Sequence, residues 1–272
     1  MDAIRVTVRR GDVVEAVHRV HAVTTDGEAW GNPELAFFLR SSAKPIQAVP
    51  FVEGYDDLDD DEIAIACASH RAEPAQLAAV RKVLARAGAT VDDLENGLQE
   101  CRPEGRLGHN CSGKHAGMLA ACRAHGWPMH PYRAHDHPLQ KRIAELVGGR
   151  EFETDGCGVP TFAVNLREAA SFLTRAPQRI RDAMRARPEL VGASTGATDT
   201  DLMRLRDGWI AKGGAEGLLC AAHSDGRGVA LKAEDGASRA LGPALAVVLG
   251  IDELREAAVC NSRGERVGSI SA

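Results

Sequence analysis

Aromatic side chains are scarce in this chain of 272 residues, which contains 6 Phe, 3 Trp and 2 Tyr. So few rings argue against the rows of stacking platforms on which many proteins bind single-stranded nucleic acid. The net charge is −5 and the sequence has no run of basic residues, which argues against binding driven by the release of phosphate counterions. We therefore expect a protein with no nucleic-acid partner.

Long apolar segments are also missing. The longest unbroken apolar runs are six residues, at 63–68 and 244–249, whereas a membrane-spanning helix needs about 20. The first five residues lack the basic-then-apolar order of a signal peptide. The seven cysteines are an odd number and include no Cys-x-x-Cys pair, which indicates reduced thiols rather than a disulfide framework. These features predict a cytoplasmic protein that does not contact a membrane.

Lysine is rare as well, because only six of the 33 basic residues are lysine. A desolvated lysine can lose its proton and act as a base or a ligand, whereas arginine stays protonated. Codon bias accounts for lysines that lie among charged residues, as Lys82 and Lys141 do. It accounts less well for Lys44, Lys114 and Lys232, which are therefore candidate functional residues.

The hydrophobic pattern changes along the chain. Apolar and polar residues alternate at 3–9 as in a half-buried strand, and near the other end two mostly apolar segments flank the turn signal at 224–227 as in a hairpin. This pattern predicts strands at 3–9, 13–23, 35–39, 217–222, 228–233 and 266–270, and extended chain at 151–164. Elsewhere the apolar residues have helical spacing. This helical spacing predicts helices at 46–52, 59–68, 74–87, 91–98, 116–125, 139–147, 166–174, 177–186 and 237–249.

This order of elements predicts an α/β (α+β) fold. An antiparallel sheet formed from N- and C-terminal segments is packed by helices, and a mostly helical second lobe lies beside it. The sequence has no repeat and no flexible linker, so we expect a single domain over 1–272. Its sheet lobe would comprise about 1–60 plus 205–272, and its helical lobe about 61–204.

Ser41 and Lys44 form the only Ser-x-x-Lys pair in the chain and lie where an expected strand meets an expected helix. At the entry to a helix this spacing puts the hydroxyl and the amine on one face. A desolvated, neutral lysine could then accept the serine proton and activate the serine as a nucleophile. A serine N-cap followed by a surface lysine has the same pattern, so spacing alone leaves both interpretations open.

Two further positions are candidates for the same site. Ser69 and His70 follow the apolar run at 63–68, so they emerge from the end of a buried helix. That segment by itself favours a helix-end serine and an exposed histidine. Lys232 interrupts an otherwise apolar strand. It is either a charged residue that protects a sheet edge or a buried cation that points into the site of Ser41.

Two glycine-rich loops each expose a cysteine, and zinc favours sulfur, nitrogen and oxygen ligands. On ligand chemistry the candidates in these loops are Cys111, Cys157, His109, His115 and Asp155. The two cysteines fit equally well as separate small core residues. Apolar surroundings predict core positions for Cys67, Cys122, Cys220 and Cys260. Cys101 opens a polar loop and has no assigned role.

Taken together, these segments resemble one family, the zinc-containing asparaginase II enzymes of the inducible thermolabile rhizobial type. The motif Arg40-Ser41-Ser42-Ala43-Lys44-Pro45 carries much of the resemblance. Further matching segments follow in order at 67–70, 110–115, 155–160, 214–217 and 231–236, with Arg9-Arg10-Gly11 and His18 before them. Several motifs in the right order are far more specific than any one of them, and they span nearly the whole chain.

The resemblance implies a fold like that of serine β-lactamases and Ser-Lys glutaminases, and a homodimer. It implies hydrolysis of a small-molecule substrate, L-asparagine, to L-aspartate and ammonia by a Ser/Lys acyl-enzyme mechanism beside a zinc site. The catalytic pairs that it implies are Ser41 with Lys44 and Ser69 with Lys232. The implied Zn2+ ligands are Cys111, Lys114 and Cys157. The implied substrate-binding residues are Arg40, His115 and Asp155.

Three alternatives remain open at this point. A glutaminase would differ in pocket depth and would hydrolyse the longer amide. A penicillin-recognising protein would share Ser-x-x-Lys, but its usual Lys-Thr-Gly strand is here Lys232-Ala233-Glu234. A zinc-binding module without catalytic activity would keep the cysteines and release no ammonia.

Overall fold

The computed structural model describes residues 1–100, 102–148 and 152–272, so Cys101 and the start of the expected extended segment at 151–164 lie outside it. The chain divides into two units. The sheet unit comprises Met1–Phe37, Val164–Thr174 and Gly213–Ala272, and the helical unit comprises Phe38–Ala163 and Arg175–Lys212. The division falls at Phe37 rather than near residue 60, because the chain is already helical from Lys44 and packs there against later helices.

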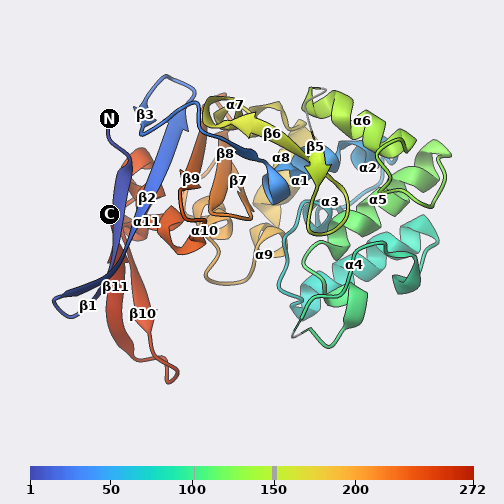
Figure 1. The fold of residues 1–272 in the computed structure, drawn as a ribbon. Coiled ribbons are helices and arrows are strands. Elements are labelled where there is room, and N and C mark those ends of the chain that lie inside the picture. Colours follow the sequence, from blue (N-terminus) through green and yellow to red (C-terminus); the bar gives the residue numbers. More distant parts are fainter. Residues whose placement is uncertain (101, 149–151) are drawn as a thin grey trace. The chain divides into compact units, whose positions relative to one another are not determined.

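Strands from both ends of the chain build the main sheet (Figure 1). Among the described residues its order is β10-β11-β1-β2-β9-β8-β7, with β3 paired to β2. The bounds are β1 Ile4–Arg10, β2 Val13–Thr24, β3 Ala29–Trp30, β7 Trp209–Gly214, β8 Leu218–His223, β9 Gly228–Ala233, β10 Glu256–Cys260 and β11 Arg266–Ser271. Thr7 faces Ser271 across the antiparallel β1–β11 pair. The predicted α+β fold with a sheet from both ends is therefore confirmed.

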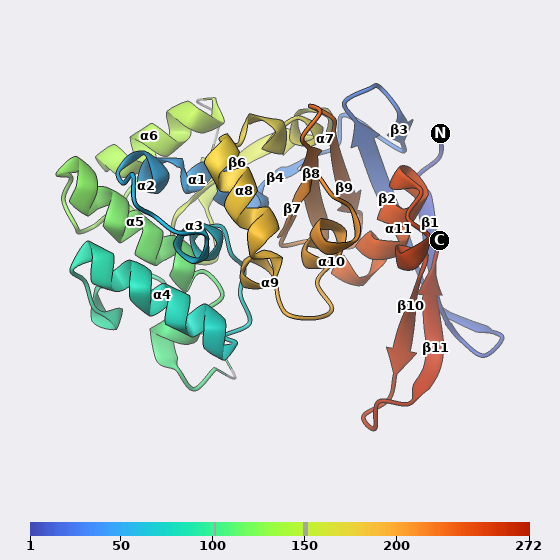
Figure 2. The same ribbon diagram turned by 180° about the vertical axis from the view of Figure 1, so that it is seen from behind.

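Helices cover the two faces of this sheet. Figures 1 and 2 show α11 (Leu241–Leu249) on one side and α7 (Leu166–Ala170) on the other. Strand β9 lies under both helices and is buried along nearly its whole length. At Gly228 a Cβ would lie 2.1 Å from the Ala170 carbonyl oxygen, so only glycine lets α7 approach this closely.

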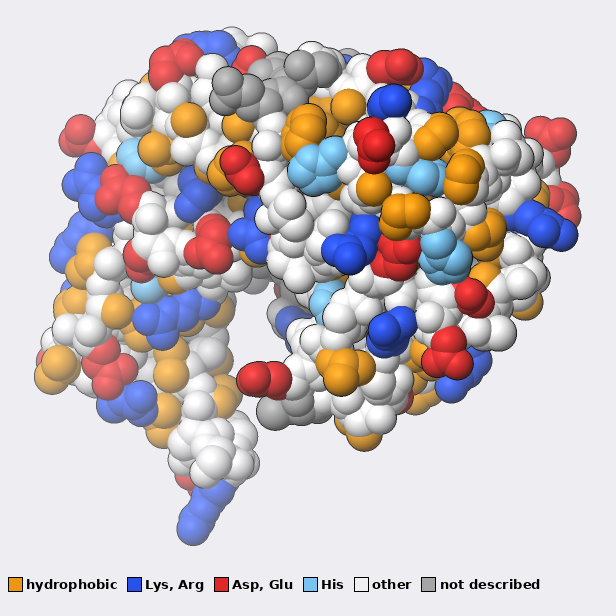
Figure 3. Space-filling view, turned by 45° about the vertical axis from the view of Figure 1, so that its right-hand side comes forward, with side chains coloured by type: hydrophobic (Ala, Val, Ile, Leu, Met, Phe, Trp, Pro, Cys, Tyr) orange, Lys and Arg blue, Asp and Glu red, His pale blue; other side chains and the backbone are white. Residues whose placement is uncertain are grey.

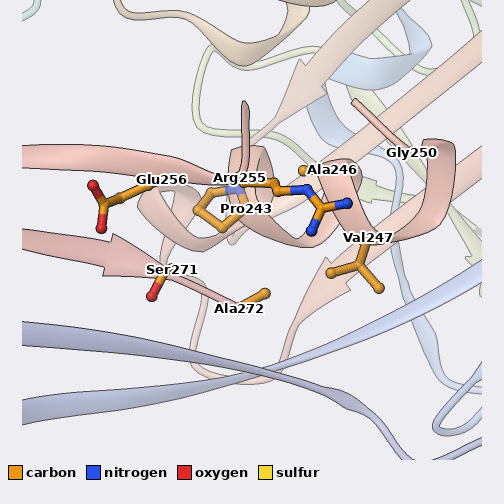
Figure 4. A pocket seen from close by; sticks show the side chains of 8 residues that line it. All are labelled: Pro243, Ala246, Val247, Gly250, Arg255, Glu256, Ser271 and Ala272. Atoms are coloured by element: carbon orange, nitrogen blue, oxygen red, sulfur yellow. The ribbon is translucent and has the colours of Figure 1, made fainter. Parts of the chain in front are cut away.

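A cavity of about 350 Å³ opens in the sheet unit beside α11, β10 and β11 (Figure 4). Its apolar wall is formed by Pro243, Ala246 and Val247. The Arg255 side chain extends toward Val247 in this view. None of the residues that line the cavity is among the predicted site residues.

The helical unit is built around α3 (Asp60–Ala66), which packs against four other helices. Its apolar sequence explains this central position, and an Asp59–Glu62 capping box fixes its start. The remaining helices are α1 Lys44–Gln47, α2 Val49–Glu53, α4 Pro74–Ala87, α5 Ser112–His125, α6 Pro138–Val147, α8 Gln178–Ala186, α9 Pro188–Val191 and α10 Thr198–Leu205. The expected helices at 59–68, 74–87, 139–147 and 177–186 correspond to α3, α4, α6 and α8.

The prediction of a helix at 91–98 is wrong, because this segment forms only a 3-10 turn at Val91–Asp93. Thr90 and Asp93 form a capping box that fixes the start of this turn, but Leu94 already has an extended backbone, with φ of −68° and ψ of 123°, and ends it. Helix α5 begins at Ser112 rather than at 116, so Lys114 and His115 lie on its first turn and not in a loop. Helices α9 and α10 and strands β3, β7 and β10 were not predicted.

Close contact between α3 and α5 places the start of α5. At Gly113 a Cβ would lie 2.2 Å from the backbone oxygen of Ile65, which is on α3. The absence of a side chain therefore lets the first turn of α5 touch the backbone of the last turn of α3. This contact brings the residues after α3 beside the residues at the start of α5, and His70 donates its backbone N–H to the Asn110 oxygen at 3.2 Å.

On the face drawn in Figure 3, Lys and Arg side chains are interspersed with Asp and Glu side chains. Within the described residues no helix has both the length and the apolar character that a bilayer crossing requires.

Replacing Gly113 by alanine should lower the free energy of unfolding by about 2 kcal/mol, because the new methyl group meets backbone that cannot move independently. Urea unfolding of both proteins measures this difference. The matched control is Gly97→Ala, since no atom lies within 4 Å of a Cβ at that position. Equal stabilities of the two variants would contradict the close contact.

Candidate active site

Lys44 is wholly buried at the first position of α1. Its Nζ donates hydrogen bonds to the Ala68 carbonyl oxygen at 2.5 Å and to Ser69 Oγ at 3.0 Å. Both acceptors lie just after α3. Burial lowers the pKa of Lys44 to about 8. The Cys111 sulfur opposes this shift, and the charge of Lys212 adds to it. The ammonium form still predominates at pH 7, but this amine loses its proton far more readily than an ordinary lysine does.

Ser41 lies one 3-10 turn before Lys44, in the segment Arg40–Ala43, and its side chain is half-buried. The Lys44 backbone N–H donates to the Ser41 carbonyl oxygen. The amine of Lys44, however, hydrogen-bonds to Ser69 and not to the Ser41 hydroxyl. The lysine side chain extends from its own turn to the end of α3, which sequence spacing could not reveal. The structure thus brings Lys44 and Ser69 together, and Ser41 lies three residues before Lys44 along the chain.

Arg40 has a left-handed backbone, with φ of 48°, directly before Ser41. This conformation costs a residue with a side chain about 1 kcal/mol, so the surroundings must hold it in place. The Arg40 N–H donates to Thr161 Oγ1 at 3.0 Å, and its Nε donates to Asp155 Oδ1 at 2.5 Å. The Leu39 N–H donates to the Phe162 oxygen at 2.9 Å. The backbone that enters the Ser41 turn is therefore fixed by strand β6 (Pro160–Asn165) and by the loop before it.

Asp155 is largely buried beside two cations. Burial by itself would raise the pKa of this carboxyl, but Lys114 and Arg40 outweigh burial and hold the pKa below its ordinary value. The Gly156 N–H adds a hydrogen bond at 2.7 Å. Asp155 is thus an anion that orients Arg40. Two of the three predicted substrate-binding residues therefore form one ion pair, in which the side chain of Asp155 is 10% exposed and that of Arg40 is 27% exposed.

Cys111, Lys114 and Cys157 converge in the helical unit and are all buried. Lys114 Nζ donates to the Cys157 sulfur at 2.9 Å. A hydrogen bond from Cys157 lowers the pKa of Cys111 well below its ordinary value, and Lys44 and Lys114 act in the same direction. Burial would lower the pKa of Lys114, but the two sulfurs raise it. The hydrogen bond to Cys111 and burial raise the pKa of Cys157, so the structure joins an ammonium group to one thiolate, Cys111, and one thiol, Cys157.

His115 is wholly buried next to this cluster. Its Nδ1 lies 2.8 Å from the hydroxyl of Tyr132, and its Nε2 has no hydrogen-bond partner among the described residues. Burial lowers the pKa of His115 to about 4, although the Cys157 sulfur acts in the opposite direction. His109 is differently engaged, because its Nδ1 accepts the backbone N–H of Cys111 at 3.0 Å.

The residues of this cluster fit the zinc ion that the sequence resemblance implies. Two sulfurs and an amine converge in a buried place, which is a donor set that zinc accepts. Within the described ranges no three His, Cys, Asp or Glu side chains cluster closely enough to hold an ion. A metal at this place would therefore need Lys114 as a ligand, and that amine would have to lose its proton.

His70 corrects one expectation. The segment favoured an exposed histidine, but His70 is wholly buried. Its Nε2 lies 2.8 Å from Ser112 Oγ and its Nδ1 accepts the Ala72 N–H at 3.1 Å. Burial lowers the pKa of His70 to about 3, so the ring is neutral. The cause is the close packing of α3 against α5, which covers the residues that follow α3.

Lys232 lies on β9 in the sheet unit, where its Nζ donates to the Ala233 oxygen at 2.6 Å. Burial lowers the pKa of this amine, against the opposing charges of Glu216 and Asp235. Its pairing with Ser69 stays a prediction. Among the cysteines expected in the core, Cys67, Cys122 and Cys220 are buried, but Cys260 is exposed because it ends the edge strand β10.

Lys212 was missed by the sequence analysis. It is buried at 1% exposure on β7, its Nζ lies 3.4 Å from Asp199 Oδ2, and its charge helps lower the pKa of Lys44. The signal was present, because Lys212 is one of only six lysines and follows the apolar residues Trp209, Ile210 and Ala211. Its effect on Lys44 could not be predicted, because the two residues are 168 positions apart.

Among solved structures, the chain is similar to a candidate β-lactamase from Bacteroides dorei DSM 17855, with 14% identity, 84% of each chain covered and a TM-score of 0.40. No curated protein matches the chain. The model of the L-asparaginase II family matches residues 6–271, which is nearly the whole chain and includes every predicted site residue. The chain therefore belongs to the L-asparaginase II family.

Proposed function

We propose that this protein hydrolyses L-asparagine to L-aspartate and ammonia through an acyl-enzyme on Ser41. The observation that carries the proposal is the wholly buried amine of Lys44, three residues after Ser41 and hydrogen-bonded to Ser69. Family membership supports asparagine as the substrate. A lysine with its pKa lowered toward neutrality, in contact with a serine hydroxyl, supports Ser/Lys chemistry.

In the proposed reaction, the neutral amine of Lys44 accepts the proton of Ser41 while Ser41 Oγ bonds to the side-chain carbonyl carbon of asparagine. Backbone N–H groups stabilise the oxyanion. The carbon–nitrogen bond then breaks, and the Lys44 ammonium returns its proton through the Ser69 hydroxyl to the leaving ammonia. Water attacks the ester, which releases aspartate and restores the Ser41 hydroxyl.

The α-carboxylate and α-ammonium of asparagine need fixed partners of opposite charge. Arg40 and Asp155 supply both signs on an already ordered pair, held by Thr161 and by the Gly156 N–H. Arg40 directly precedes the nucleophile Ser41, and Asp155 lies two residues before Cys157. This ion pair would therefore hold the charged end of the substrate at a set distance from Ser41.

Zinc at this site would be held by Cys111, Cys157 and Lys114. When bound, it would supply a fixed positive charge that polarises a nearby substrate group. The serine chemistry takes its base from Lys44, so the metal and the base are separate groups in this proposal.

Ser41→Ala should abolish ammonia release and change the free energy of unfolding by less than about 1 kcal/mol, because Ser41 is half-buried and its hydroxyl makes no described hydrogen bond. Lys44→Arg should be as inactive as Lys44→Met, since a guanidinium cannot serve as a base. Steady-state ammonia assays and urea unfolding measure both effects.

The matched controls for the lysine variants are Lys82→Arg and Lys82→Met, because Lys82 is exposed and paired with Asp59. Both control variants should keep wild-type activity. Full activity of Ser41→Ala, or rescue of the Lys44 site by arginine, would overturn the assigned roles.

The protein purified from zinc-supplemented medium should contain about one zinc ion per chain. Cys111→Ser and Cys157→Ser should lose the metal, whereas Cys260→Ser should keep it, since Cys260 is exposed. Elemental analysis of the four proteins is the measurement. Metal-free wild type, or equal zinc content in all variants, counts against the site.

The ratio kcat/KM should favour L-asparagine over L-glutamine by at least about 10-fold, because one added methylene moves the amide carbon out of register with Ser41 once the charged end is held. Both amides are assayed at one pH. Comparable values would reassign the protein as a mixed asparaginase-glutaminase, and a preference for glutamine would make it a glutaminase.

A further inference from the structure

The hydroxyl of Ser42 ties the turn that contains Ser41 to strand β7. Ser42 is 0% exposed, and its Oγ donates to the backbone oxygen of Lys212 at 2.9 Å. Ser42 lies between Ser41 and Lys44, so this hydrogen bond holds the backbone between the proposed nucleophile and the proposed base. The position of this turn therefore depends on the position of Lys212.

Lys212 is in turn held by the first turn of α10. Its Nζ lies 3.4 Å from Asp199 Oδ2, and both side chains are buried. A buried ion pair adds little net stability over apolar side chains of similar size, because burial of both charges is costly. The hydrogen bond between the two side chains is directional, however, so it fixes β7 at Lys212 against α10.

The next residue of the same turn, Thr200, holds a second segment. Its hydroxyl is buried, donates to the Pro188 oxygen at 3.0 Å and accepts the Ala193 N–H at 3.3 Å. These two bonds use the one hydroxyl proton and one oxygen lone pair, and they tie down both ends of the segment 188–193. Figure 2 shows the helices α9 and α10, to which these residues belong or lie next, side by side.

The segment 188–193 supports Ser69. The Val191 oxygen accepts the backbone N–H of Ser69 at 2.9 Å. Contact with α10 is also close at Gly192, where a Cβ would lie 2.5 Å from Asp199 Oδ1. The absence of a side chain at Gly192 therefore lets the segment that supports Ser69 lie directly against the first turn of α10.

We propose that the first turn of α10 is a positioning element that sets the distance between Ser41 and Ser69. Asp199 acts on the turn of Ser41 through β7. Thr200 acts on Ser69 through the segment 188–193. The need for this distance rests on the proposed function, in which Ser69 passes a proton to the ammonia that leaves the acyl-enzyme on Ser41.

Hydrogen exchange followed by mass spectrometry tests the positioning without any assay of activity. Thr200→Val removes the hydroxyl and keeps the size of the side chain, so the backbone around Ser69 should exchange about 10-fold faster than in the wild type. Thr200→Ser keeps the hydroxyl and should exchange like the wild type. The matched control is Thr198→Val, because Thr198 lies on the same turn and its hydroxyl makes no described hydrogen bond.

Steady-state kinetics tests the consequence for the reaction. Ser42→Ala and Thr200→Val leave every charged group in place, so neither variant alters the charge of Lys212. Each should lower kcat for L-asparagine about 10-fold and change KM less than about twofold, because the groups proposed to bind the charged end of the substrate are untouched. Thr200→Ser should keep the wild-type kcat. Ser171→Ala is the matched control for Ser42→Ala, since the Ser171 hydroxyl also donates to a backbone oxygen but is exposed.

The two parts fail separately. Faster exchange around Ser69 in Thr200→Val, together with a wild type that releases no ammonia from asparagine, would disprove the proposed function and keep the positioning role. Equal exchange around Ser69 in the wild type and a folded Thr200→Val protein would refute that role. An unchanged kcat despite faster exchange would show that the reaction does not need this positioning. Should Thr200→Val fail to fold, faster exchange at 40–47 in Ser42→Ala would support the proposal, and unchanged exchange there would refute it.

Discussion

The buried primary amine of Lys44 is the constraint around which the helical unit is organised. This amine has no carboxylate partner among its described contacts. Lys44 Nζ gives hydrogen bonds to a backbone oxygen and to Ser69 Oγ, both at the end of α3. Burial of a charged ammonium is costly, so the native packing lowers the pKa of Lys44 to about 8. Removal from water thus makes this amine easier to deprotonate, which is the property that the proposed acyl transfer needs in its base.

The same packing assembles the rest of the cluster. Helices α3 and α5 touch at Gly113, and this contact places Cys111 and Lys114 near Lys44. Each of these groups then alters its neighbours, since Lys44 and Lys114 stabilise the Cys111 thiolate while the sulfur opposes proton loss from both amines. The protonation state of each of these groups therefore depends on the others. The backbone contact at Gly113 holds them close enough for this.

Local patterns in the sequence predicted the elements well where the pattern was long, as for α4, and where both chain ends alternate, as for β1 and β11. They also singled out Ser41 and Lys44. The contact of Lys44 with Ser69, the burial of His70 and the role of Lys212 could not be predicted, because each depends on packing between segments far apart in sequence. Family resemblance supplied the order of motifs, whereas only the structure gives the hydrogen bonds among them.

The central claim is that a serine at the start of the helical unit forms a covalent acyl intermediate with its amine neighbour as base. Rapid acid quenching during turnover of L-asparagine, followed by peptide mapping by mass spectrometry, tests it most directly. The account predicts an aspartyl ester on the peptide that contains Ser41, present in wild type and absent from Ser41→Ala. An adduct on the peptide that contains Ser69, or turnover with no ester on any serine, would contradict it.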